Sequence, residues 1–213
     1  MKLFIDVETI PTPIEDRLFL KPDNNNIKYG NATKEDTKKK ILEEAIKNFE
    51  EGTDCASSAL TGKVTLIGYA INETPIEFLD NDSERILLHN FWETVNKNNI
   101  ECIIGHNITE FDIPFLIRRS WLHGIFNNAW IISELTKYTT NKILDTNKAW
   151  LFNKRHEYIS LKNLCGFFGV SMKDSEVNKK DFYKFWTQDK EKCKDYCKQQ
   201  IEATRKIYNI ITD

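Results

Sequence analysis

Leu3-Phe4-Ile5-Asp6-Val7-Glu8-Thr9-Ile10, a stretch close to the amino terminus, sets two acidic residues among β-forming side chains. A strand places residues i and i+2 on one face, so Asp6 and Glu8 should point the same way. Ionised groups in an apolar core are costly unless they are paired or bind a metal, and Mg²⁺ prefers carboxylate oxygens. The alternative is a strand end whose acids lie in solvent. The motif alone leaves both interpretations open.

The composition is typical of one globular domain. The 213 residues suffice for one sizeable core, and 40% hydrophobic with 12% aromatic residues excludes a disordered chain. Because the net charge is −2, any binding of nucleic acid must depend on local lysines or metal ions. No apolar run approaches a membrane span and no secretory signal is present, which predicts a cytoplasmic protein without membrane contacts. The five scattered cysteines are expected to be reduced, and a metal site at Cys193 and Cys197 is disfavoured because no third ligand is near in sequence.

Strand and helix patterns alternate along most of the chain. Strands are expected at 3–10, 63–72, 76–79, 101–105 and 143–145, and helices at 34–49, 83–98, 113–122, 160–168 and 189–211. The first three strands suit an antiparallel meander, and the alternation after them favours a mixed sheet with helices on its faces. Thr33 or Asp36 should cap the first helix, and Asp82 or Ser83 the second. The chain is therefore predicted to be a single domain, 1–213, with a loop-and-helix insertion at about 11–60.

A second informative stretch runs Ile104-Gly105-His106-Asn107-Ile108-Thr109-Glu110-Phe111-Asp112-Ile113-Pro114. An apolar strand ends at Gly105, a polar loop follows, and Asp112 is positioned as the N-cap of the next helix. Capping alone would explain Asp112. However, ligands bind at strand ends in open α/β sheets, and Asp6-Val7-Glu8 also closes a strand. A third carboxylate at that edge would complete an acidic cluster.

A third stretch, from Asp195 to Thr204, lies on the last predicted helix. Tyr196 and Gln200 are four residues apart and therefore share one helical face. The alternative for Tyr196 is a core aromatic residue whose hydroxyl reaches the surface.

Together these stretches resemble the DEDD 3′–5′ exonucleases, in the tyrosine (DEDDy) variant that includes the proofreading domains of family-B DNA polymerases. The resemblance is carried, in this order, by Asp6-x-Glu8, Asn107-x-x-x-Phe111-Asp112 and Tyr196, with further matches at Leu144-Asp145-Thr146 and Ser160-Leu161-Lys162-Asn163-Leu164. It spans nearly the whole chain except about 11–60, where some phage and bacterial stand-alone members carry a similar loop and helix. The resemblance implies an RNase H-like α/β fold, a mixed β-sheet flanked by helices.

The same resemblance implies an activity. Single-stranded nucleic acid, with DNA favoured over RNA, would be hydrolysed from the 3′ end to nucleoside 5′-monophosphates with two Mg²⁺ or Mn²⁺ ions. Asp6 would bridge both ions, Glu8 would serve the first and Asp112 the second, while Tyr196 would orient the attacking water. The substrate-binding residues implied are Thr9, Ile10, His106, Asn107 and Phe111. A DNA polymerase or other replication proteins are the expected partners.

One position departs from the family pattern. The third motif is Tyr-x-x-x-Asp, and this chain has Gln200 four residues after Tyr196. As a metal ligand, Gln200 offers one neutral carbonyl oxygen, so the first metal site should be weakened. Three hypotheses follow: an exonuclease with reduced activity, an inactive module that binds nucleic acid, or a proofreading partner of a separate polymerase.

Overall fold

The computed structural model describes residues 1–53, 55–126, 129–135, 142–152, 157–179 and 181–212. The chain falls into two compact units. The first consists of Met1–Glu8 together with Val64–Asp213, and the second is Thr9–Lys63. Within the described ranges, no helix combines the length and the apolar character needed to cross a membrane.

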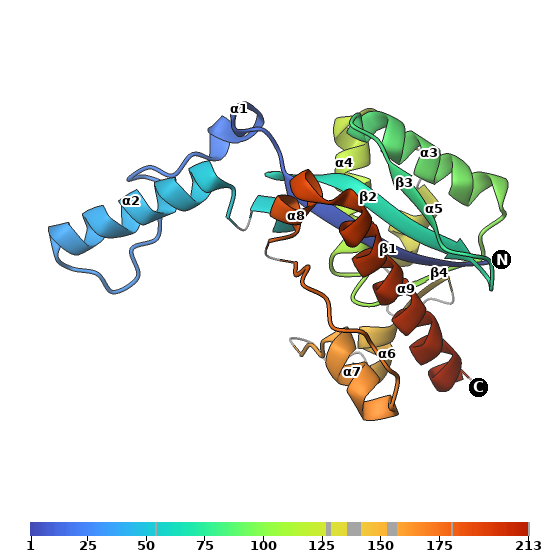
Figure 1. The fold of residues 1–213 in the computed structure, drawn as a ribbon. Coiled ribbons are helices and arrows are strands. Elements are labelled where there is room, and N and C mark those ends of the chain that lie inside the picture. Colours follow the sequence, from blue (N-terminus) through green and yellow to red (C-terminus); the bar gives the residue numbers. More distant parts are fainter. Residues whose placement is uncertain (54, 127–128, 136–141, 153–156, 180, 213) are drawn as a thin grey trace. The chain divides into compact units, whose positions relative to one another are not determined.

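The first unit is built on a mixed sheet. Its described strands follow the order β3-β2-β1-β4-β5 (Figure 1). They are β1 (Lys2–Pro11), β2 (Gly62–Ile71), β3 (Glu77–Asp80), β4 (Cys102–Gly105) and β5 (Ile143–Asp145). β2 and β3 are antiparallel, whereas β4 is parallel to both β1 and β5. The predicted mixed sheet is confirmed, and the first three strands are neighbours in the expected order.

The parallel strands bring their carboxyl ends to one edge of the sheet. The register pairs Phe4 with Ile104, and Gly105 with Asp145. The chain beyond Phe4 on β1 therefore runs beside the residues that follow β4 and β5. Ligands bind at this edge in open α/β sheets.

Helices flank the sheet. In the first unit they are α3 (Glu84–Lys97), α4 (Asp112–Leu122), α5 (Ala129–Leu135), α6 (Thr146–Leu151), α7 (Leu161–Phe168), α8 (Phe182–Gln188) and α9 (Lys190–Thr212). Helix α9 runs along one face of the sheet, and α3 and α4 lie on the other (Figure 1). Both faces of β1 are consequently covered, and Leu3, Phe4 and Ile5 are each at most 2% exposed.

Close packing holds α9 against the sheet. A Cβ atom built on Gly68 would lie 2.5 Å from Cys197 Sγ and 2.7 Å from Ile201 Cδ1, so β2 accepts this helix because residue 68 has no side chain. The ring of Phe4 packs edge-on against Tyr208, with centroids 5.4 Å apart. These contacts fix the rotation of α9 about its axis and therefore the direction in which Tyr196 points.

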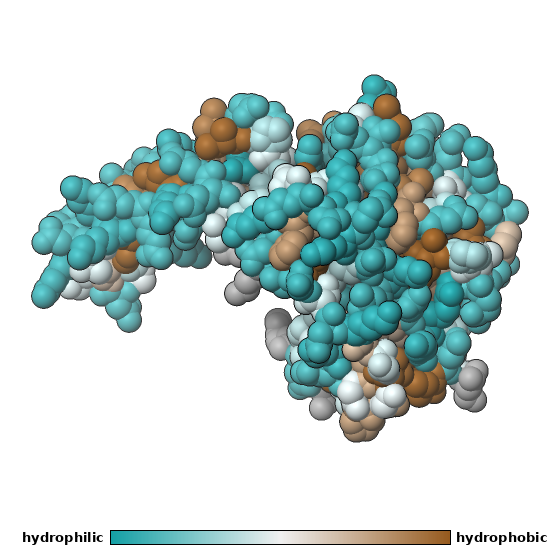
Figure 2. Space-filling model, in the orientation of Figure 1, coloured by the Kyte–Doolittle hydropathy of each residue, from teal (hydrophilic) through white to brown (hydrophobic). Residues whose placement is uncertain are grey.

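Helix α7 packs against the carboxyl-terminal half of α9. The shared core consists of Leu161, Leu164, Cys165, Ala203 and Ile207. Hydrophobic surface gathers over α6 and α7 on the face drawn in Figure 2. On α7 the side chain of Phe167 is 68% exposed, and the centroid of its ring lies 4.8 Å from that of the Trp150 ring. The start of α7 is thereby attached to the same long helix that carries Tyr196.

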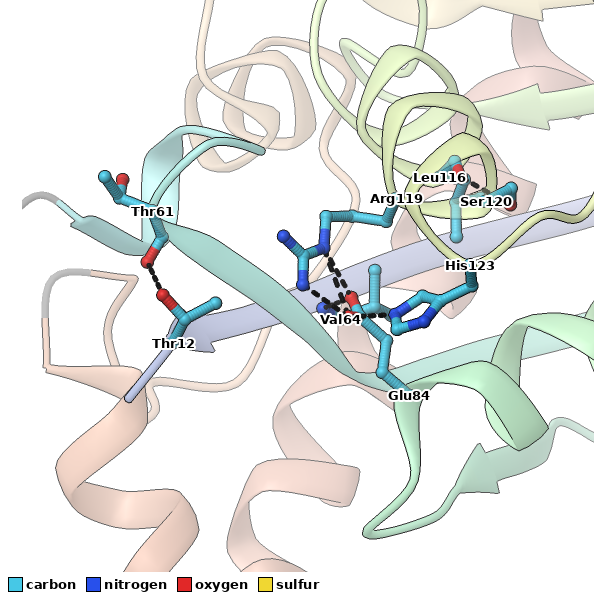
Figure 3. A network of polar contacts seen from close by, with 8 residues as sticks. All are labelled: Thr12, Thr61, Val64, Glu84, Leu116, Arg119, Ser120 and His123. Carbon is cyan, nitrogen blue, oxygen red and sulfur yellow. Dashed lines mark hydrogen bonds and ion pairs between the residues drawn. The ribbon is translucent and has the colours of Figure 1, made fainter. Parts of the chain in front are cut away.

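A buried carboxylate joins α3, α4 and the start of β2. Glu84 accepts hydrogen bonds from the backbone N–H of Val64 at 2.7 Å and from Arg119 Nε at 3.0 Å (Figure 3). Arg119 Nη2 and His123 Nε2 lie 2.6 Å and 2.9 Å from Glu84 Oε2. Glu84 and Arg119 are each 7% exposed, and removing one partner of such a pair leaves an uncompensated buried charge.

The unit Thr9–Lys63 contains the helix predicted there. Helix α2 (Glu35–Glu51) confirms the expected helix and is followed by Gly52 in the left-handed conformation, with φ of 75°. The shorter helices are α1 (Ile14–Arg17), η1 (Leu18–Leu20) and η2 (Cys55–Ser57). The hydroxyl of Thr12 donates to the carbonyl of Thr61 at 2.9 Å and so joins the two ends of this unit (Figure 3).

Several details correct the sequence predictions. Asp112 does not cap α4: Phe111 is the N-cap and Asp112 is the first helical residue. The carboxylate of Asp112 accepts the N–H of Val7. Lys34, rather than Thr33 or Asp36, is the N-cap of α2, without a side-chain bond. The structure adds α5, α6 and α8, whose six or seven residues make helices too short to be stable without tertiary packing.

Candidate active site

Two carboxylates of β1 have oxygens without partners. Glu8 is 5% exposed and Asp6 is half-buried. Among the described residues, Asp6 Oδ2 and Glu8 Oε1 are shielded from solvent yet accept no hydrogen bond. Buried charged oxygens without partners are destabilising, so both atoms suit a site completed by a cation or a proton.

Asp112 joins these two acids through the backbone of β1. Its Oδ1 accepts a hydrogen bond from the N–H of Val7 at 2.9 Å, and the residue is 5% exposed. The turn before α4 is closed by a bond from the N–H of Ile113 to the carbonyl of Ile108. A Cβ atom on Gly105 would overlap the side chain of Ile108, so this tight turn needs glycine there. The loop after β4 thereby brings a third carboxylate to β1.

Burial raises the pKa values of all three acids. Burial first, and then the nearby charge of Asp6, raise the pKa of Asp112 from 3.8 to about 7. Burial followed by the charge of Asp6 raises the pKa of Glu8 well above its usual value, and burial also raises the pKa of Asp6. Burial and mutual repulsion therefore favour the protonated forms of these acids unless a cation compensates their charge.

A lysine that no sequence pattern singled out lies near these acids. Burial alone would lower the pKa of Lys179, but the charges of Asp6, Glu8 and Asp112 raise it. Its side chain lines the same cavity as Asp6 while keeping solvent-exposed surface. Lys179 stands in a polar segment before α8 where lysine is unremarkable, so only the folded structure identifies it as part of the site.

A cavity of about 310 Å³ lies beside the acids, at the lower end of the size range of small-molecule sites. Its wall includes the predicted residues Asp6, His106, Tyr196 and Gln200, together with Tyr158, Ser160, Leu161, Lys162, Lys173, Asn178 and Lys179. Glu8 and Asp112 are buried and do not form part of this wall. Neither Asn107 nor Phe111 is among the described residues that line the cavity.

Helix α9 contributes Tyr196 and Gln200 to the wall, one turn apart, as their spacing predicts. Tyr196 is 9% exposed, and its ring lies 6.4 Å from that of Phe182. Burial, followed by the charges of Glu8 and Asp6, raises the pKa of the Tyr196 hydroxyl, which therefore keeps its proton at neutral pH. Gln200 is half-buried and places a neutral amide where the family pattern has a carboxylate.

Asp145 organises the loop that carries Asn107. Its Oδ1 accepts from the N–H of Asn107 at 2.8 Å, and its Oδ2 accepts from the N–H and hydroxyl of Thr109 at 3.0 Å and 2.6 Å. Asp145 also caps α6 by accepting from the N–H of Asn147. Asn107 has φ of 63°, a left-handed conformation that asparagine tolerates better than most residues. One buried carboxylate thus fixes an unusual loop conformation beside the cavity.

His106 and Phe111 are engaged in contacts within the protein. His106 Nδ1 lies 2.9 Å from the hydroxyl of Thr146, its Nε2 lies 2.8 Å from the carbonyl of Ile159, and burial lowers its pKa. The ring of Phe111 lies 5.4 Å from that of Phe115. Both ring nitrogens of His106 therefore have protein partners before any substrate binds.

The other two predicted substrate residues belong to the unit Thr9–Lys63. Thr9 follows Glu8 directly on β1, is 7% exposed, and donates from its hydroxyl to the carbonyl of Ala56 at 2.7 Å. Ile10 is half-buried. The hydrogen bond to Ala56 links Thr9 to η2, near the other end of the same unit.

The donor set suits a hard divalent ion shared with a phosphate rather than a closed metal cage. Within the described part of the chain, no three His, Cys, Asp or Glu side chains approach closely enough to hold one ion. Asp112 directs one oxygen to Val7, which leaves Asp6 and Glu8 as the donors with unpartnered buried oxygens. Mg²⁺ is commonly bound by one or two carboxylates together with waters and substrate phosphates. Asp6 and Glu8 therefore fit Mg²⁺ or Mn²⁺.

One known protein is similar to this chain in sequence, and another is similar in fold. An uncharacterized protein of Methanocaldococcus jannaschii is 29% identical over 159 residues, which cover 71% of this chain and 86% of that protein. The family B DNA polymerase of the hyperthermophilic archaeon Pyrobaculum calidifontis has a similar fold, with a TM-score of 0.61 and 13% identity. That similarity covers 95% of this chain and 23% of the polymerase, so the chain spans less than a quarter of its length. The predicted RNase H-like α/β fold is confirmed.

The sequence also matches a known protein family. Residues 26–164, more than half of the chain, match the exonuclease domain of DNA polymerase family B. The matched segment contains Asn107 and Asp112 and ends before Tyr196. The chain belongs to the family of family B DNA polymerase exonuclease domains.

Proposed function

We propose that this protein is a 3′–5′ exonuclease of the tyrosine (DEDDy) variant, which releases nucleoside 5′-monophosphates from single-stranded nucleic acid. The observation that carries the proposal is the pair of buried, unpartnered oxygens of Asp6 and Glu8, together with a cavity whose wall includes Asp6 and Tyr196. Membership of the exonuclease-domain family supports the class of reaction. We treat the chain as one domain in which about 11–60 is an insertion.

Asp6 and Glu8 are the residues that would hold the first divalent ion, with the amide oxygen of Gln200 as a neutral ligand. Asp112, together with Asp6, would serve a second ion. Bound Mg²⁺ or Mn²⁺ would supply charge that polarises the phosphate and lowers the pKa of water. Replacing a carboxylate by an amide removes an attraction of a few kcal/mol at an effective dielectric of ~20. We therefore expect activity to need more metal than a site with four acids would.

Tyr196 would act by positioning rather than as a base. Because its hydroxyl stays protonated, it can donate one hydrogen bond and accept another, which is sufficient to orient a water molecule toward a phosphate. A base at this position would require a lowered pKa instead.

Lys179 would bind the phosphate of the substrate. A phosphodiester that approaches Asp6, Glu8 and Asp112 meets like charge, and the ammonium of Lys179 offsets part of that repulsion. The same cation can contact non-bridging phosphate oxygens and stabilise negative charge that develops there. This contact would be independent of the base sequence of the substrate.

The terminal nucleotides would be held by Asn107 through hydrogen bonds and by Phe111 through stacking, with His106, Thr9 and Ile10 as further contacts. DNA is favoured over RNA by the relation to a DNA polymerase domain. A DNA polymerase or other replication proteins are the proposed partners, since the matched family consists of exonuclease domains of DNA polymerases. The cytoplasm is the proposed location.

Gln200 supports a second candidate function, a module that binds nucleic acid with little or no turnover. Without the last acid of the family pattern, the first ion would be held by two carboxylates and one neutral oxygen. Such a module would bind single strands and would assist a polymerase without cleaving the strand itself.

The test is a nuclease assay on single-stranded DNA and RNA of the same sequence, labelled at either end. The first hypothesis predicts stepwise shortening of 5′-labelled strands and release of labelled mononucleotide from the 3′ end, both abolished by EDTA and by Asp6→Ala. Asp82→Ala, which removes a fully exposed acid, is the matched control and should behave as wild type. Binding without shortening at any Mg²⁺ or Mn²⁺ concentration would refute the exonuclease and favour the binding module.

A further inference from the structure

Tyr158 lines the cavity, on a segment whose backbone is held by side chains from two other parts of the chain. The N–H of the next residue, Ile159, donates to Asn147 Oδ1 at 3.0 Å, and its carbonyl lies 2.8 Å from His106 Nε2. Ser160 then caps α7, its hydroxyl accepting from the N–H of Asn163 at 3.2 Å. The backbone that carries Tyr158 is therefore held by side chains from the loop after β4 and from α6.

The ring of Tyr158 is exposed although it lines a cavity. The residue is 61% exposed, and its main ring contact is with His106, whose centroid lies 6.1 Å away at an interplanar angle of 64°. Tyr158 lines the same cavity as Lys179 and Tyr196, so it lies beside the proposed reacting part of the site. A residue that served only to cover His106 would bury this ring. Instead, much of its surface is open.

The other residues of the wall make this ring distinctive. Of the aromatic residues among the described lining, Tyr196 is buried and His106 is half-buried with both nitrogens engaged, whereas Tyr158 offers open ring surface. Cationic side chains accompany it in the wall, namely Lys162, Lys173 and Lys179. An exposed aromatic face together with cations is the combination that proteins use to bind single strands: the rings stack on bases and the cations contact phosphates.

We infer that Tyr158 is a stacking platform for one of the two bases at the 3′ end of the bound strand. The inference rests on the proposed function, since it assumes that the cavity receives a strand end. Stacking does not depend on the identity of the base, because every base has a π-face. Tyr158 is thus a substrate-positioning residue, while the acids and Lys179 act on the phosphate.

The first experiment measures KM and kcat for hydrolysis of a short single-stranded DNA. Tyr158→Ala should raise KM roughly 5- to 100-fold, the range that loss of one stacked base produces, with a smaller change in kcat. Tyr158→Phe and Tyr158→Trp keep an aromatic face and should remain within about threefold of wild type. Phe126→Ala, which removes another exposed ring, of 67% exposure, outside this cavity, is the control and should leave KM unchanged.

The second experiment separates stacking from a structural role. Strands with an abasic site at the last or the next-to-last nucleotide are compared for binding by fluorescence anisotropy, in the Asp6→Asn background with and without Tyr158→Ala. If Tyr158 stacks on a base, removing that base should weaken binding to the parent and should not weaken binding to Tyr158→Ala any further. Equal penalties in both proteins at both positions would overturn the inference, as would an unchanged affinity of Tyr158→Ala.

Failure of the proposed function would look different. A protein that binds strands without cleaving them would refute the exonuclease, yet the abasic comparison would still support or overturn the role of Tyr158. An active exonuclease whose KM does not respond to Tyr158→Ala would refute the stacking role and leave the exonuclease intact.

Discussion

Replacing Asp6 by asparagine should stabilise the metal-free protein at alkaline pH and abolish activity. Raising an acid pKa from 3.8 to about 7 disfavours the ionised form of Asp112 by roughly 4 kcal/mol. Burial is the larger cause and the charge of Asp6 the second, so removing that charge should recover about 1–2 kcal/mol. Glu8 is affected in the same direction, because the charge of Asp6 also raises its pKa.

The sign of the pH dependence follows from the direction of these shifts. The native protein holds protons on Asp112 and Glu8 that the unfolded chain releases above about pH 4, so stability should fall as the pH rises from about 4 through 7. Asp6→Asn should therefore gain stability at pH 8, where the acids are ionised, and should gain little at pH 5. Bound metal should reverse the order, since the wild type offers it one more carboxylate.

The assay is thermal or urea unfolding followed by circular dichroism at pH 5, 6.5 and 8, first in EDTA and then in excess Mn²⁺. Asp82→Asn is the matched control, because it removes one acid that is fully exposed and should not change stability at any pH beyond about 0.5 kcal/mol. Equal stabilities of wild type and Asp6→Asn at pH 8 in EDTA would refute the reasoning. The same gain at pH 5 as at pH 8 would show that the effect does not come from ionised neighbours.

Three further predictions concern the site and its support. Lys179→Met should raise KM by about tenfold or more through loss of a phosphate contact, whereas Lys179→Arg keeps the charge and should lose less. Lys97→Met, which removes an exposed lysine outside the cavity wall, is the control, and an equal effect of Lys97→Met would contradict a specific role of Lys179. Gln200→Asp should shift the Mg²⁺ titration of activity to lower concentration, with the smallest gain in excess Mn²⁺; identical titrations would show that Gln200 does not reach the metal. Glu84→Gln should lower the free energy of unfolding, measured by urea titration, by about 3–5 kcal/mol, because the buried guanidinium of Arg119 loses its charged partner. A loss of stability below about 1 kcal/mol would contradict a stabilising buried ion pair.

The sheet could be predicted because its strands are marked by local sequence. Apolar runs such as Leu3 to Ile10 and 63–72 are bounded by turn residues, and the strand–helix alternation after them restricts the topology to a few choices. The spacing of Tyr196 and Gln200 likewise predicts a shared helical face, because that relation depends on the period of one helix.

The parts of the site that escaped prediction depend on contacts between distant segments. Asp112 has the local signature of an N-cap, yet its carboxylate accepts the N–H of Val7, 105 residues away in sequence. Asp145, which is 38 residues after Asn107 in sequence, accepts a hydrogen bond from the Asn107 backbone and so anchors this loop. Short α6 and α8 form because they pack against larger elements, and isolated segments of that length are not stable helices.

Lys179 and Gln200 both make one site less negative than a site of four acids alone. Three acids and one nearby ammonium give a formal charge of about −2 when all are ionised, whereas four acids with the same lysine would give about −3. The lower charge reduces the attraction for a divalent ion, and it equally reduces the repulsion that a phosphodiester meets on entering the cavity. The raised pKa values of Glu8 and Asp112 show that the three acids already repel one another in this buried setting, so a fourth would increase that repulsion in the metal-free protein. In the proposed site, Gln200 would therefore weaken metal binding and would favour the metal-free fold at the same time. Because Lys179 contributes to the electrostatic potential of the same site, the effects of substituting Lys179 and Gln200 on metal and substrate binding should not be additive.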